Sequence, residues 1–138
     1  MNDNNIIEAI HWLQYANEDL ITAGKMIQEG GYVYRHACFW SQQAAEKALK
    51  AIFVFLQVEY PLRHDLDALR LRLPDDWSVK NEQIDLARLT EWAVEARYPG
   101  DWGEATFDDA RVAFDQAKAV VESISKEFYR RGIFNNHE

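Results

Sequence analysis

The stretch SQQAAEKALKAIFVFL (41–56) decides the fold, because its apolar residues recur at helical rather than strand spacing. We expect the segment 32–58 to form the longest helix. Its broad inward-facing stripe contains Ala37, Ser41, Ala44, Ala45, Ala48, Leu49, Ile52, Phe55 and Leu56. The alanines of this stripe allow a neighbouring helix to approach closely, either within the chain or across a seam with a second copy.

Four further segments carry helical periodicity or helix-boundary signals. We expect helices over 5–28, 65–73 and 81–96, and a last helix that starts near residue 106. Asn5 with Glu8, and Thr106 with Asp109, fit capping boxes at the first and last of these starts. Prolines and paired glycines separate the segments. No run of alternating apolar residues predicts a strand, so we predict an all-α, up-and-down bundle of about five helices.

Length and composition favour one globular domain. The 138 residues (1–138) are expected to form a single helical domain, with a core over about 6–128 and a short disordered C-terminal tail. The net charge of −8 opposes generic binding to nucleic-acid backbones, although a local basic patch stays open. The single cysteine, Cys38, is expected to be a buried thiol, which fits a reducing compartment.

Several classes of site and location are not indicated by the sequence. It contains no Gly-rich phosphate loop, HExxH, CxxC or GxSxG pattern. The four histidines, His11, His36, His64 and His137, share no metal-ligand spacing, so we expect no metal and no cofactor. Without a leader-like start or a long apolar run, the expected location is cytoplasmic and away from membranes.

Three segments could carry polar chemistry. Gln43, Glu46, Lys47 and Lys50 project from one helix face, where they could bind a polar ligand or partner. The alternative is an ordinary solvated face with a Glu46–Lys50 ion pair. Either interpretation fits the spacing alone.

The other two segments lie at helix boundaries. His64 precedes Asp65, which could cap the next helix or accept a hydrogen bond from the imidazole, leaving His64 as a loop anchor or an acid–base group. Arg97 is followed by Tyr98 and, after a Pro-Gly turn, Trp102. An arginine beside two aromatic rings is suited to hold a phosphate or stack on a base. Alternatively, it could bond the last carbonyls of the preceding helix or pair with a buried carboxylate.

Taken in order, these segments resemble a HEPN domain, the higher eukaryotes and prokaryotes nucleotide-binding family. The motifs that carry the resemblance are ANEDL (16–20), GY (31–32), QQAAEKALKA (42–51), HDL (64–66) and RYP (97–99). Together they extend over about residues 8–126, which is nearly the whole chain.

The resemblance implies a helical bundle that is usually a homodimer and often acts with a minimal nucleotidyltransferase as a two-component, toxin–antitoxin-like pair. Many relatives are metal-independent ribonucleases that use an arginine and a nearby histidine, paired across the dimer. For this chain it implies a ligand site formed by Arg97, Tyr98, His64, Asp65, Gln43, Glu46 and Lys47.

This sequence departs from the ribonuclease pattern after Arg97. No histidine occurs in 101–107, and Glu104 stands where some relatives carry a tyrosine. Arg131 and His137 have the right spacing but lie in the tail, so we interpret them as a chance match. The sequence therefore predicts a nucleotide- or RNA-phosphate-binding module. The alternatives are a ribonuclease toxin, with Arg97 and His64 as catalytic candidates, and a non-catalytic structural dimer subunit.

Overall fold

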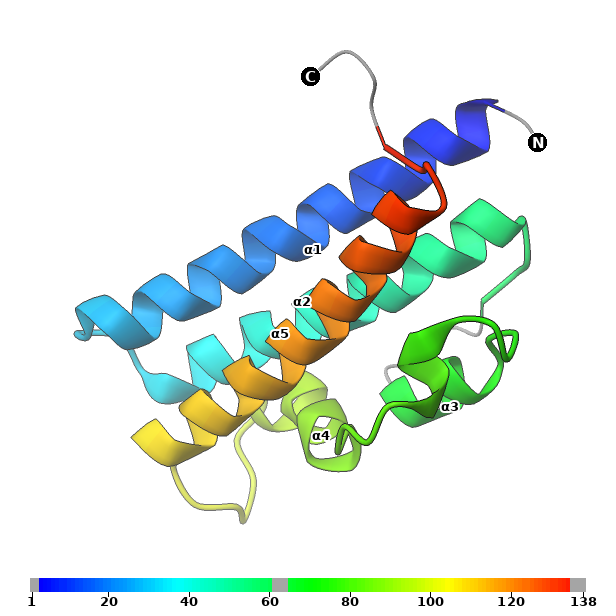
Figure 1. Ribbon diagram of the computed structural model, residues 1–138. Helices are drawn as coiled ribbons and strands as arrows, with labels where there is room; N and C mark the ends of the chain where they lie inside the picture. Colours follow the sequence, from blue (N-terminus) through cyan, green and yellow to red (C-terminus); the bar gives the residue numbers. More distant parts are fainter. Residues whose placement is uncertain (1–2, 61–64, 135–138) are drawn as a thin grey trace.

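The computed structural model describes residues 3–60 and 65–134 (Figure 1). Its helices are α1 (Asp3–Glu29), α2 (Tyr34–Leu56), α3 (Leu66–Leu71), α4 (Ala87–Glu95) and α5 (Phe107–Arg130), with a 3₁₀ turn η1 (Ser78–Asn81) before α4. The described residues contain no strand, which confirms the prediction of an all-α bundle with five helices. None of the described helices combines the length and apolar character needed to cross a membrane.

The three long helices set the direction of the bundle. A tight turn joins α1 to α2, and the two run antiparallel (Figure 1). The shorter elements α3, η1 and α4 then carry the chain back along one side, so that α5 runs in the same direction as α2. Two ring contacts fix this arrangement, Tyr34 with Phe107 near the starts of α2 and α5 and Phe55 with Phe128 near their ends.

The close packing of α1 against α2 follows from small side chains. Alanines of both helices are fully or almost fully buried: Ala9, Ala16, Ala23, Ala37, Ala44, Ala45, Ala48 and Ala51. Within the described residues, this is the most extensive helix–helix interface. The alanine stripe of α2 is therefore covered inside one chain, as the intramolecular interpretation predicted. Cys38 is also buried, and burial raises the pKa of its thiol to about 12.

Two of the expected helix caps are present. Thr106 and Asp109 form the full capping box of α5, because each side chain accepts a hydrogen bond from the backbone N–H of the other. Asp65 caps α3 by accepting a hydrogen bond from the Ala68 N–H at 3.1 Å. The third cap was predicted wrongly. Since α1 already begins at Asp3, Asn5 lies inside the helix and does not form a capping box with Glu8.

The helix expected over 81–96 is shorter than predicted and begins at Ala87. The reason is a tertiary contact. Arg70 of α3 donates hydrogen bonds to the carbonyl oxygens of Glu82 and Ile84, both at 3.1 Å. These contacts hold the segment before α4 in an extended course, and a helix there would need the same carbonyls for its own bonds.

The packed region continues past residue 128, where the core was expected to end. After α5, Gly132 adopts a positive φ of 76°, and the chain turns so that Ile133 is 6% exposed. Arg131 also packs, with its guanidinium 3.9 Å from the centre of the Trp77 ring. The expected tail is therefore ordered against the bundle as far as Ile133, and the segment 135–138 lies outside the described residues.

Candidate functional site

A pocket of about 310 Å³ lies where the loop between α4 and α5 approaches the start of α2. Its lining is formed by Arg35, Trp92, Glu95, Ala96, Arg97, Tyr98, Pro99, Gly100, Trp102, Gly103, Glu104 and Ala105. The volume lies at the small end of the range typical of small-molecule sites. Of the sequence-predicted site residues, this pocket brings together Arg97 and Tyr98.

Arg97 lies on the wall of this pocket just beyond the end of α4. Its Nε donates a hydrogen bond to the Ala93 carbonyl oxygen at 2.7 Å, so the predicted alternative of bonding to the end of the helix is present. The guanidinium also lies 5.5 Å from the Phe39 ring centre and 5.6 Å from that of Tyr98. These contacts orient the side chain through its Nε and its flat face.

The terminal nitrogens of Arg97 make no hydrogen bond or ion pair with the residues that the structure describes. Most Lys and Arg side chains in the same ranges do pair with a carboxylate. The described exceptions are Lys25, Arg72, Arg97 and Lys126. Arg97 is thus held in place by its Nε while its two NH₂ groups stay available for an anion.

Two aromatic rings flank this arginine. Tyr98 and Trp102 are 58% and 41% exposed, which is high for large aromatic side chains. The Trp102 ring lies against Gly100 so closely that a Cβ there would come within 2.5 Å of it. The glycine therefore lets the indole ring fold back over the loop and form part of the pocket wall.

The acidic residues of the pocket are paired. Glu95 accepts a hydrogen bond from Arg88 at 2.8 Å, and the Arg88 guanidinium stacks on Trp92, 4.1 Å from the ring centre. Glu104 faces Arg35 at 3.8 Å, with the two side chains 85% and 41% exposed. Arg88 thus balances the one carboxylate that is largely buried, and the arginines of the lining remain cationic toward an incoming ligand.

The polar stripe of α2 lies elsewhere and is not a solvated face. Glu46 is 4% exposed and accepts hydrogen bonds from Gln42 at 3.3 Å and Lys50 at 3.4 Å, so the predicted Glu46–Lys50 pair is present. Gln43 donates to Gln42, and Lys47 donates to Asp19 of α1 at 2.6 Å. The alternative of an ordinary solvated face was therefore wrong, because these side chains are buried or half-buried and Lys47 and Lys50 contact Asp19 and Trp12 of α1. None of them lines the Arg97 pocket.

The remaining candidates do not meet at the pocket. His64 lies outside the described residues, and so does His137. Asp65 serves as the cap of α3 and is absent from the pocket lining. Over the described ranges, no group of three or more His, Cys, Asp or Glu side chains is placed to hold a metal ion.

Residues 9–128 match the sequence profile of the family described as "HEPN domain", which covers most of the chain. The chain belongs to the HEPN family. The sequence motifs had predicted this membership on their own. No curated protein matches the chain significantly.

Two crystal structures of similar proteins agree with the HEPN assignment. One is TT1696 from Thermus thermophilus, with a TM-score of 0.68, and the other is ST0689, described as an archaeal HEPN homologue, with a TM-score of 0.64. Each is 26% identical in sequence, and each match covers 86% of this chain and 96% of the other. The fold predicted from the HEPN resemblance is therefore confirmed.

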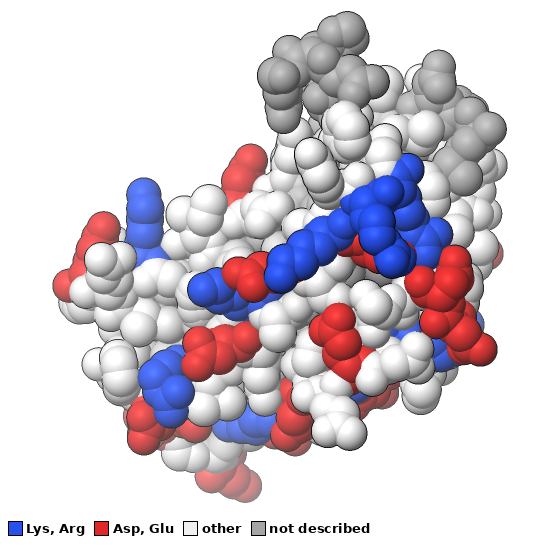
Figure 2. All heavy atoms as spheres, in the orientation of Figure 1, with Lys and Arg blue, Asp and Glu red and all other residues white. Residues whose placement is uncertain are grey.

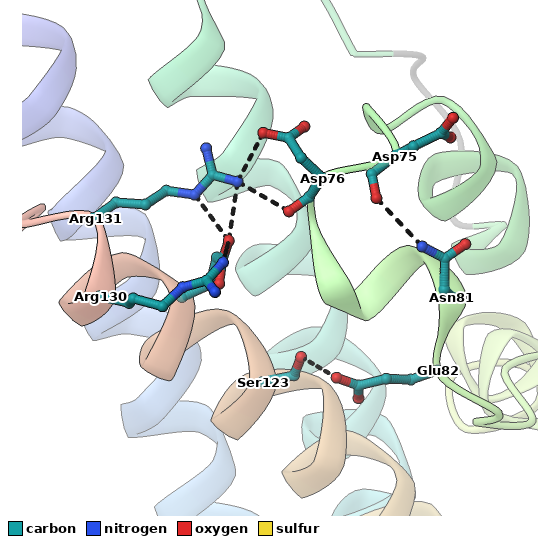
Figure 3. A network of polar contacts seen from close by, with 8 residues as sticks. Asp75, Asp76, Asn81, Glu82, Ser123, Arg130 and Arg131 are labelled. Carbon is teal, nitrogen blue, oxygen red and sulfur yellow. Dashed lines mark hydrogen bonds and ion pairs between the residues drawn. The ribbon is translucent and has the colours of Figure 1, made fainter.

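A second group of arginines lies at the C-terminal end of α5 in this HEPN domain (Figure 3). Glu127, 5% exposed, accepts hydrogen bonds from Arg130 and, at 2.9 Å, from Arg131. Arg131 also donates to the carbonyl and carboxylate oxygens of Asp76, both at 3.0 Å. Nearby, Ser123 donates to Glu82 at 2.6 Å. This network fastens α5 to the segment around η1.

The network decides the role of Arg131, whose spacing to His137 had been interpreted as a chance match. Its guanidinium is engaged by two carboxylates and by the Trp77 ring, so it acts in packing. Figure 2 shows that basic side chains gather over the C-terminal half of α5 with acidic ones among them. Lys126 and Arg130 belong to this half of the helix, and Lys118 lies at its midpoint.

Sequence reasoning missed Arg35, Glu95 and Glu104 as parts of the site. Arg35 is in the first turn of α2, far along the chain from Arg97, and it reaches the pocket because Tyr34 packs on Phe107. No spacing rule connects these segments. The loop from Arg97 to Trp102 was predicted as a candidate phosphate site, but its sequence does not indicate that Arg35 lies opposite it.

Proposed function

We propose that this HEPN protein binds a nucleotide or an RNA phosphate in the Arg97 pocket. The observation that carries the proposal is the state of Arg97, whose Nε is anchored while its terminal nitrogens have no described partner. A planar guanidinium with two NH₂ groups directed to a ligand is suited to bidentate phosphate binding. The pocket therefore provides a cationic group that can bind a phosphate, although the net charge of the whole chain is −8.

The rings beside Arg97 support a nucleotide over a bare anion. Tyr98 and Trp102 are exposed at the rim, where an aromatic face can stack on a base. The loop offers no histidine for proton transfer, and Trp102 occupies the first position where the family pattern would place one. We therefore propose binding with weak or no hydrolysis, since a positioned acid–base group typically contributes about 10²–10⁴-fold.

The first test is a titration of adenosine monophosphate and of a short single-stranded RNA into the purified protein, followed by calorimetry. Arg97→Ala should weaken binding about 10- to 100-fold, the expected loss for one charged hydrogen-bonding partner. The matched control is Arg72→Ala, because Arg72 is also exposed and without a described ion pair but lies outside the pocket. Absence of binding by the wild type, or equal affinity for Arg97→Ala, would contradict the proposal.

The ribonuclease alternative is tested on the same proteins. RNA cleavage in the presence of EDTA that disappears in both Arg97→Ala and His64→Ala would make the protein a metal-independent nuclease. Intact RNA for every variant, with Arg97-dependent binding, would leave the binding module.

The partner proposals rest on the HEPN family resemblance. We propose that the chain forms a homodimer and acts with a minimal nucleotidyltransferase in a toxin–antitoxin-like pair. Light scattering of the purified chain tests the dimer, with a monomer mass as the contradicting result. Co-purification with a nucleotidyltransferase encoded next to it tests the pair.

A further inference from the structure

Arg35 lines the same pocket as Arg97 and, unlike Arg97, has an acidic partner among the described residues. Its Nη1 lies 3.8 Å from a carboxylate oxygen of Glu104. That distance allows an ion pair but is too long for a hydrogen bond. Both side chains are well exposed, at 41% for Arg35 and 85% for Glu104. An exposed ion pair without a hydrogen bond is weak, so a stronger anion can replace Glu104 at little cost.

The backbone holds the two sides of this pair in place. Arg35 belongs to the first turn of α2, and Glu104 precedes the capped start of α5. The rings of Tyr34 and Phe107, next to these positions, meet edge to face with their centres 5.9 Å apart. Arg35 therefore stays at the pocket whether or not Glu104 is bound to it, and only the side chain of Glu104 has to turn away.

The other groups of the pocket leave both arginines to the ligand. Glu95 is held by Arg88 and is 15% exposed, so it does not compete for Arg35. Among the residues that the structure describes, Arg97 forms a hydrogen bond through its Nε alone. The cavity of about 310 Å³ exceeds what one phosphate group would fill, and both arginines belong to its lining.

We infer that Arg35 is a second phosphate-binding residue of this pocket, that Glu104 occupies it in the absence of ligand, and that the site prefers a ligand with two phosphate groups. This inference rests on the proposed function, in which Arg97 binds the first phosphate. A phosphate replaces Glu104 because it accepts two parallel hydrogen bonds from a guanidinium and carries at least as much charge as a carboxylate. Two phosphates occur in a nucleoside diphosphate and in a 5′-phosphorylated dinucleotide.

The experiment compares affinities for ligands that differ by one phosphate. Adenosine diphosphate is compared with adenosine monophosphate, and the dinucleotide pApA with ApA. The full-length chain is titrated as wild type and as Arg35→Ala and Glu104→Gln. Matched controls are Arg111→Ala, an exposed arginine paired with carboxylates outside the pocket, and Glu122→Gln, whose ion pair with Lys118 also measures 3.8 Å.

The wild type should bind the ligand with the additional phosphate about tenfold more tightly in at least one of the two comparisons. Arg35→Ala should reduce that ratio to near one while leaving the weaker ligand's affinity unchanged. Glu104→Gln should raise affinity for the two-phosphate ligand several-fold, because it removes the competing charge. The pair of ligands that shows this tenfold difference in affinity tells whether the second phosphate belongs to a nucleoside diphosphate or to a 5′-phosphorylated dinucleotide.

The outcomes separate this inference from the proposed function. If Arg97→Ala abolishes binding but Arg35→Ala and Glu104→Gln leave both ratios as in the wild type, Arg35 is not a phosphate ligand and the nucleotide site stands. If no ligand binds, or if Arg97→Ala binds as the wild type does, the proposed function fails and the inference fails with it. Circular dichroism of each variant excludes misfolding as the cause of lost binding.

Discussion

The two ends of α5 carry arginines in opposite states. Beyond its C-terminus, Arg131 is engaged by Glu127, Asp76 and the face of Trp77 (Figure 3). The pocket lies near the N-terminal end of α5. It contains Arg97, which has no ion pair with a described residue, and Arg35, which has a weak one. Partners in space, rather than spacing in the sequence, therefore decide whether an arginine stabilises the fold or is available to a ligand.

The largest loss of stability is expected when Glu127, the carboxylate that pairs with Arg130 and Arg131 at the C-terminal end of α5, is removed. Glu127→Ala should lower the free energy of unfolding by about 2 kcal/mol, measured by urea denaturation. The loss is smaller than for a fully buried pair because Arg130 is 70% exposed and can be hydrated. Glu122→Ala, five residues earlier on α5 and exposed, is the control and should change stability by less than about 0.5 kcal/mol. Equal losses would show that the network does not stabilise the protein.

Truncating one arginine at each end tests the comparison directly. Arg131→Ala should lower the free energy of unfolding by about 1.5 kcal/mol, because it removes charged hydrogen bonds and a ring contact on Trp77. Arg97→Ala should lower it by only about 0.5 kcal/mol, since that side chain is exposed. Urea denaturation of the two variants side by side measures the difference. A larger loss for Arg97→Ala would reverse the assignment of roles.

Low pH should reduce the stabilisation that Glu127 contributes through its pairs with Arg130 and Arg131. Burial alone would raise the pKa of Glu127, but hydrogen bonds and charges from Arg130 and Arg131 outweigh it and hold the pKa below its ordinary value of 4.5. A carboxylate with a lowered folded pKa contributes its full stability above 4.5 and loses it as pH falls through the folded pKa. The stability difference between wild type and Glu127→Gln should therefore shrink as pH falls below 4.5. A difference that is constant across this range would contradict the assignment.

The smallest effect on stability is expected in the pocket loop. Gly100→Ala should change the free energy of unfolding by less than about 0.5 kcal/mol, because the loop is exposed. It should nevertheless displace the Trp102 ring, which a Cβ would meet at 2.5 Å, and so change the tryptophan fluorescence and weaken nucleotide binding. Gly103→Ala is the control, because a Cβ there meets nothing within 4 Å. The same response in both variants would mean that the ring contact is unimportant.

The features that the sequence predicted correctly are determined by residues close together in the chain. The cap pair Thr106 and Asp109 and the alanine spacing of α2 depend on neighbours within a few residues, and the structure contains both features. The start of α4 was misplaced because Arg70 binds carbonyls twelve and fourteen residues further along the chain. The contact of Lys47 with Asp19 was missed for a similar reason, since Asp19 lies on α1, 28 residues earlier in the chain.

The candidate site was predicted only in part. Arg97 and Tyr98 were found from their place at a helix end, and both line the pocket. Arg35 was not found, because it reaches the pocket only through the contact between the starts of α2 and α5. Such contacts between distant segments follow from topology, and no local pattern encodes them.

The shared direction of α2 and α5 also separates charge along the bundle. Aligned peptide dipoles give each helix a partial positive charge at its start and a partial negative charge at its end. Asp108 and Asp109 offset the positive end of α5, whereas the first turn of α2 contains no acidic residue and its N-cap Val33 makes no side-chain cap. The pocket is thus lined both by residues at the positive start of α2 and by residues at the negative end of α4, so the helix dipoles give its two walls partial charges of opposite sign.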